Sequence, residues 1–114
     1  MPTVIVTPDS VTVRLSTAEK VGALHSDLSI PRSAIVAATV VDDSMSGVSG
    51  IRAPGYAMPG HAKLGTWRHH DGKDFIAVYA DRPAVDLRLA GQRYERLLIS
   101  VDDPHAVVAQ LGGS

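Results

Sequence analysis

Residues 50–80 have the sequence GIRAPGYAMPGHAKLGTWRHHDGKDFIAVYA, which predicts a Gly/Pro-rich loop followed by two strands joined by a tight turn. The turn falls at Asp71-Gly72, a pair that suits a short hairpin connection. Two more short strands are predicted at 84–90 and 96–101. A terminal helix follows, because Asp102 or Asp103 can cap it and Pro104 suits the first helical position. This order predicts a small antiparallel β-domain closed by a C-terminal helix.

The N-terminal half adds shorter elements. Residues 3–7 and 11–15 are rich in β-branched side chains and predict two strands. Ser16 and Glu19 form a capping box, which predicts a short helix that ends at about residue 24. A strand at 28–30, a helical turn at 31–34 and a strand at 35–41 come next, and 44–58 is predicted as one long loop. With strands at 61–70 and 74–80, residues 1–114 form a single domain of seven or eight strands.

Two predicted strands, 35–41 and 75–79, carry apolar residues on both faces. The strand at 84–90 differs, because Val85, Leu87 and Leu89 alternate with Asp86 and Arg88. A strand that is apolar on both faces is usually covered on both. The cover is predicted to be either the Gly/Pro-rich loop or a helix, or else a subunit interface.

Composition narrows the class of partner. The net charge of -1 combines 11 basic with 12 acidic residues, and no basic run stands out, which disfavours nucleic acid and membrane lipid. The five aromatic residues are scattered, unlike those of a base-stacking surface. There is no cysteine, no signal peptide is apparent, and the apolar runs are too short to span a bilayer, so a cytoplasmic protein is expected.

From Arg52 onward the chain resembles the bacterial pleckstrin-homology-like (PH-like) domains. The matching features are the Pro-Gly loop, Gly65-Thr-Trp67, Asp74-Phe75, the strand before Gly91, Tyr94, and the helix start at Ser100-x-Asp-Asp-Pro104. The resemblance covers about half of the chain and implies a partly open barrel of two near-orthogonal antiparallel sheets, with the C-terminal helix at one end. It also implies a non-catalytic binding or scaffolding role, in some members as symmetric oligomers. The basic cluster of phosphoinositide-binding relatives is missing, so lipid headgroup binding is not carried over.

Short motifs give no complete catalytic or metal site. His69, His70 and Asp71 are the most metal-like group, but zinc needs three or four ligands and neighbouring strand residues point apart. The favoured interpretation is a solvated hairpin end. Gly47-Val-Ser-Gly50 does not match a nucleophile elbow, which predicts a plain loop. The pairs Asp42-Asp43 and Asp102-Asp103 fit turn and cap roles.

One surface remains as a candidate for a ligand or partner. It comprises Arg52, Tyr56, Met58, His61, Lys63 and Trp67. The segment 50–60 is interpreted as a rigid loop that packs across the barrel, with a binding site as the alternative. Trp67 is predicted to be either a core residue, which is favoured, or an interface anchor.

The sequence therefore predicts a non-catalytic binding or scaffold module with no cofactor and no metal. Its partner is expected to be a second copy of itself, as a homo-oligomer, or an unidentified protein. The alternative is a small-molecule- or metal-binding protein, which could be an enzyme, using the 50–60 loop and the histidines His61, His69 and His70.

Overall fold

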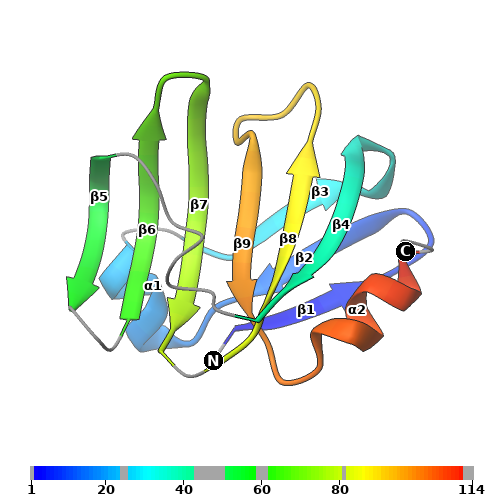
Figure 1. Ribbon diagram of the computed structural model, residues 1–114, viewed down its shortest axis with the longest axis horizontal. Helices are drawn as coiled ribbons and strands as arrows, with labels where there is room; N and C mark the ends of the chain where they lie inside the picture. The colour runs from blue at the N-terminus through cyan, green and yellow to red at the C-terminus, as the bar shows by residue number, and fades with distance from the viewer. Residues whose placement is uncertain (1, 24–25, 43–50, 59–61, 81, 112–114) are drawn as a thin grey trace.

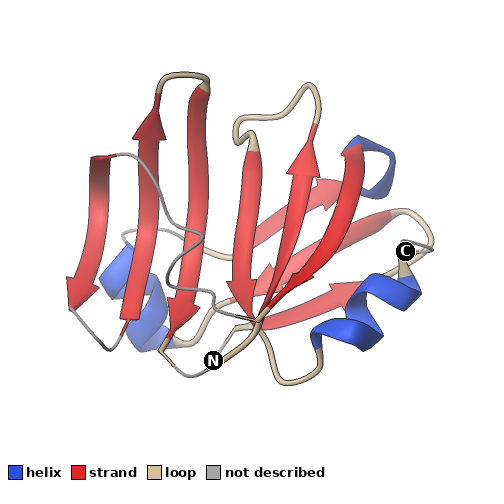
Figure 2. Ribbon diagram, viewed as in Figure 1, coloured by secondary structure: helices blue, strands red, loops and turns tan. Residues whose placement is uncertain are grey.

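The computed structural model describes residues 2–23, 26–42, 51–58, 62–80 and 82–111 (Figure 1). For residues 22–23 and 51–58 it describes the backbone alone. These residues form nine strands, two α-helices and one short 3₁₀ turn. The mainly β class and the C-terminal helix predicted from the sequence are confirmed (Figure 2).

The strands form two sheets. The smaller sheet has the order β1-β2-β3 and the larger has the order β4-β8-β9-β7-β6-β5. In Figure 1 the strands of the smaller sheet run crosswise behind those of the larger one, and the two sheets do not close into a barrel. The strands are β1 (Thr3–Val6), β2 (Ser10–Arg14), β3 (Leu28–Pro31), β4 (Ile35–Val41), β5 (Ile51–Met58), β6 (Ala62–His69), β7 (Gly72–Tyr79), β8 (Ala84–Leu89) and β9 (Arg96–Ser100).

The main core lies between the two sheets. Its members on the smaller sheet include Val11 and Val13, and those on the larger sheet include Phe75, Leu87 and Leu97. All five are fully shielded from solvent. Val85, Leu87 and Leu89 on β8 all belong to this core, as their alternation with polar residues predicts.

Both helices begin with the caps expected from the sequence. At the start of α1 (Thr17–Ala23), the Ser16 N–H donates to Glu19 Oε1 at 2.7 Å and the Glu19 N–H donates to Ser16 Oγ at 3.2 Å, a reciprocal capping box. At the start of α2 (Pro104–Gln110), Asp103 Oδ1 accepts from the Ala106 N–H at 3.1 Å. Helix α1 contacts β5 and β6, whereas α2 contacts β1, β4 and β8.

The long loop predicted at 44–58 is wrong over its second half. Residues Ile51–Met58 form β5, which pairs antiparallel with β6 at the edge of the larger sheet. Pro54 lies where the register shifts between Arg52 and Gly55. An edge strand with a bulge tolerates a proline, because the missing N–H takes no place in the ladder there. Residues 43–50 lie outside the described residues.

The order of strands also departs from the expected antiparallel sheets at one place. Strand β9 lies between β7 and β8, antiparallel to β8 but parallel to β7, with Asp74 opposite Arg96. The hairpin that joins β6 to β7 turns at His70-Asp71, one residue earlier than predicted, and Gly72 adopts a φ of 144° just after it. This left-handed backbone favours glycine at that position.

Candidate functional site

The far face of the larger sheet carries a second apolar cluster. It consists of the buried residues Trp67, Ile76, Val78, Ala84 and Leu98, with Val41 packed against them. Trp67 is 5% exposed, and Leu64 on the opposite face of β6 belongs to the main core. Both faces of β6 are therefore buried within a single chain, which favours the core interpretation of Trp67 over the interface anchor.

A row of charged side chains lies beside this cluster. Arg96 on β9 donates from Nε to Asp74 Oδ2 at 3.1 Å and from Nη1 to Asp86 Oδ2 at 3.4 Å. All three residues are buried. A buried arginine between two carboxylates offsets part of their charge, and its removal would leave both carboxylates poorly compensated. The sequence reasoning missed this network because its members lie on β7, β8 and β9, with no fixed spacing along the chain.

His69 extends the row to a fourth strand. Its Nε2 lies 2.8 Å from Asp74 Oδ1, and its Nδ1 accepts from the Asp71 N–H at 3.2 Å. Because a backbone N–H only donates, Nδ1 carries no proton and Nε2 is the donor to Asp74. Both ring nitrogens are therefore engaged in bonds that hold the β6–β7 hairpin end.

The structure leaves the metal-like motif at the solvated end of the β6–β7 hairpin. His70 and Asp71 are exposed at the hairpin end. Over the residues whose placement is described, no three His, Cys, Asp or Glu side chains gather as a metal ion requires. His61, the third histidine of the alternative hypothesis, lies outside that part of the chain.

Glu19 is a third buried acidic residue, only 2% exposed, and lies apart from the charged row. Its Oε1 completes the capping box of α1, and its Oε2 accepts from the Tyr79 hydroxyl on β7. Burial, then this hydrogen bond and the charge of Glu19, raise the pKa of Tyr79 above its ordinary value. The contact fastens α1 to the larger sheet, which is a structural role.

The predicted ligand surface is brought together only in part. Lys63 and Trp67 lie on β6, with Lys63 half-buried. Arg52, Tyr56 and Met58 lie on β5, where their backbones are opposite Trp67, Leu64 and Ala62. Their side chains, like the whole of His61, lie outside what the structure describes.

Strand β4 forms the opposite edge of the larger sheet from β5 and pairs with β8. Its sequence, IVAATVV, contains no charged residue and no proline. Val36, which lies where the β4–β8 register shifts, is 65% exposed, and Ala37 and Thr39 are exposed as well. Ile35 and Val40 pack against the main core, so β4 buries one face; on the other face Ala37 and Thr39 are exposed, whereas Val41 at the end of the strand packs against the second cluster.

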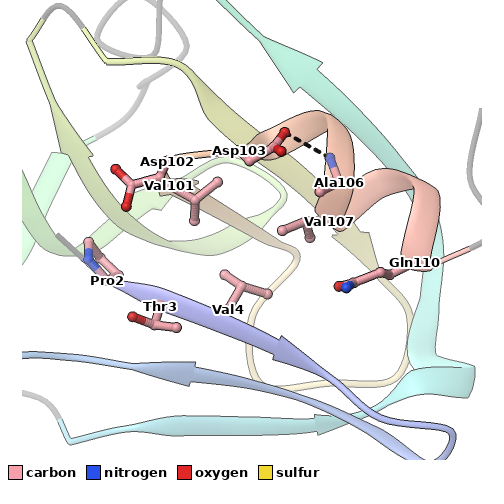
Figure 3. A pocket seen from close by; sticks show the side chains of 9 residues that line it. All are labelled: Pro2, Thr3, Val4, Val101, Asp102, Asp103, Ala106, Val107 and Gln110. Atoms are coloured by element: carbon pink, nitrogen blue, oxygen red, sulfur yellow. Dashed lines mark hydrogen bonds between the residues drawn. The ribbon is translucent and has the colours of Figure 1, made fainter.

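A groove separates β1 from α2 (Figure 3). It has a volume of about 250 Å³. Its walls combine apolar side chains with two carboxylates, from Pro2, Thr3, Val4, Val101, Asp102, Asp103, Ala106, Val107 and Gln110. In Figure 3, Val4 and Val107 lie across the groove from each other, Asp102 lies on the side of Pro2, and Asp103 caps the start of α2.

No protein-family model matches the chain, and no curated protein or solved structure matches it significantly. In the described part of the chain, no helix is both long enough and apolar enough to cross a membrane.

Proposed function

We propose that this protein is a non-catalytic, PH-like binding module that self-associates by pairing β4 with β4 of a second copy. The observation that carries the proposal is the exposed apolar side of β4 at an open sheet edge, with Val36 65% exposed. An unidentified protein partner, which the sequence also left open, would appear as a different outcome of the same experiment.

The chemistry of this edge favours pairing with a strand. An edge strand presents alternate N–H and C=O groups without partners, and proteins usually guard such edges with charges, prolines or bulges. Strand β4 has a register irregularity between Ile35 and Ala37 but continues regularly to Val41 without a charge. A strand is complementary to its own copy when the two run antiparallel, so a two-fold axis beside β4 would satisfy both edges at once.

The PH-like part of the proposal has separate support. Two crosswise sheets and a helix α2 that contacts both of them agree with the architecture that the resemblance implies. The parallel pairing of β7 with β9 departs from that architecture. Symmetric oligomers occur among the PH-like domains, which agrees with the proposed pairing.

Native mass spectrometry of the untagged protein over a range of concentrations tests the proposal. We expect a dimer that dissociates on dilution, and we expect Val36→Lys to shift the protein to monomer. The control is Val21→Lys on α1, since Val21 is 69% exposed and lies away from β4. A wild-type protein that stays monomeric throughout, or an equal loss of dimer in both variants, would overturn the proposal. A monomer that captures a different protein through Val36 would assign the edge to that partner instead.

A further inference from the structure

We propose that the groove between β1 and α2 binds an extended peptide segment that carries a basic residue, and that the segment adds to β1 as a strand. This inference is independent of β4 and of self-association. It rests on the walls of the groove, on the open edge of β1 and on the charge at the two ends.

The walls of the groove suit a side chain rather than a cofactor. On one side, α2 presents Asp103, Ala106, Val107 and Gln110, whose spacing of three and four residues places them on one helix face. Val4 of β1 and Val101 provide apolar surface opposite. The volume of about 250 Å³ is below the range of typical small-molecule pockets, which begins at about 300 Å³. One or two apolar side chains would fill this space.

The edge of β1 offers backbone partners beside those walls. The Thr7 N–H donates to the Ser10 carbonyl at 2.9 Å. Thr7 and Ser10 are therefore the hydrogen-bonded pair nearest the turn between β1 and β2. Antiparallel pairs alternate, so Ile5 and Thr3 exchange hydrogen bonds with β2. The N–H and C=O groups of Val4 and Val6 therefore point away from β2. Among the described residues, the backbone hydrogen bonds outside the regular elements do not involve these four groups.

The charged residues near the groove differ between its two ends. Asp102 is exposed at the end of the groove near Pro2, and Asp103 is exposed at the start of α2; among the residues that the structure describes, no lysine or arginine lines the walls. Beyond the other end, Arg32 bridges the two elements, donating from Nη1 to the Thr7 carbonyl at 3.2 Å and from Nη2 to the Gln110 carbonyl at 2.7 Å. A peptide with a lysine or arginine beside Asp102 and an apolar side chain beside Val4 matches both features. Addition of a strand to an open edge, with a pocket for alternate side chains, is an established mode of peptide recognition.

The test uses acetylated hexapeptides of alternating Val and Thr, with either Lys or Glu at the first or the last position. They are titrated into the whole chain, labelled with ¹⁵N, and followed by NMR. We expect the Lys peptides to shift the amides of residues 3–6 and 103–110 and to slow hydrogen exchange at Val4 and Val6. The Glu peptides should not do so. The Lys position that gives the tighter binding, first or last, shows whether the added strand runs parallel or antiparallel to β1.

Two alanines of α2 provide a matched pair of variants. Both are exposed, but Ala106 lines the groove and Ala109 does not. We expect Ala106→Arg to abolish binding and Ala109→Arg to preserve it, with both variants keeping the melting temperature of the wild type. Asp102→Asn should weaken binding about two- to fivefold, as expected for one exposed charge. Absence of shifts in residues 3–6 with every peptide, shifts confined to β4, or equal binding of Lys and Glu peptides would each overturn the proposal.

Discussion

The sequences of strands β7 and β4 are both apolar on both faces, yet the fold buries β7 and leaves part of β4 exposed. Phe75, Ile76, Ala77 and Val78 of β7 are all 0% exposed, whereas β4 leaves Val36 65% exposed. The difference follows from position, since β7 lies between β9 and β6 while β4 ends the sheet. Apolar composition thus indicates that a face is to be covered, and the place in the sheet decides whether the same chain supplies the cover.

The largest effect is expected from the charged row on the second face of β7, β8 and β9. Arg96→Met would leave the buried Asp74 and Asp86 without their shared cation and lower the free energy of unfolding by about 3–5 kcal/mol. Urea unfolding measures this loss. Arg88→Met is the control, because Arg88 also pairs with Asp86 but its side chain is 57% exposed, and a change of at most about 1 kcal/mol is expected. Equal losses would contradict the view that Arg96, and not the exposed Arg88, is the cation on which both buried carboxylates depend.

The comparison between the two strands is tested most directly by one substitution made twice. Val78→Ala on β7 should lower the free energy of unfolding by about 1.5–3 kcal/mol, since it removes buried methyl groups and leaves a cavity. Val36→Ala on β4 should change the stability of the monomer by less than about 0.5 kcal/mol. Thermal or urea unfolding at low protein concentration measures both. A large loss in the monomeric Val36→Ala variant would contradict the view that β4 needs a second chain for its cover.

A single hydrogen bond fastens the start of α1 to β7, and its loss is expected to cost less than the loss of Arg96. Tyr79→Phe removes the hydroxyl donor of the buried Glu19 carboxylate, and a loss of about 1–3 kcal/mol is expected near neutral pH. Because the pKa of Tyr79 is raised in the folded state, its contribution is complete below about pH 10, the ordinary tyrosine value, and falls as the pH rises further. Urea unfolding from pH 8 to 11 should therefore show the gap between wild type and Tyr79→Phe narrowing above pH 10. If the difference in stability between wild type and Tyr79→Phe widened with pH, the pKa of Tyr79 would be lowered, not raised, in the folded state.

Local chemistry explains which elements were predictable. Ser16 with Glu19 and Asp103 with Pro104 fix both helix starts through contacts within three residues, so the sequence alone locates them. Strand β8 was equally clear because its main-core face alternates with polar residues. The other face of β8 was less clear, because Asp86, which the alternation places on the polar face, is buried against Arg96.

Non-local pairing explains most of what the sequence could not provide. Strand β5 was hidden by Pro54 and its neighbouring glycines, which a bulged edge strand accommodates. The placement of β9 between β7 and β8 depends on contacts distant along the chain. The link from His69 to Asp74 had a usable signal, because a turn centred on residues 70–71 places both side chains on one face of the hairpin. The groove between β1 and α2 has no such signal, since the ends of the chain form it together.

The central place of β9 has a consequence for biosynthesis. Without residues 96–100, the larger sheet divides into one pair, β4 with β8, and one three-stranded piece of β5, β6 and β7. Because the chain is synthesised from its N-terminus, the apolar surfaces of these two pieces stay uncovered until β9 emerges from the ribosomal exit tunnel. We expect the domain to fold only after nearly all of it is made, and to depend on chaperones during that interval more than a simple meander of the same length would.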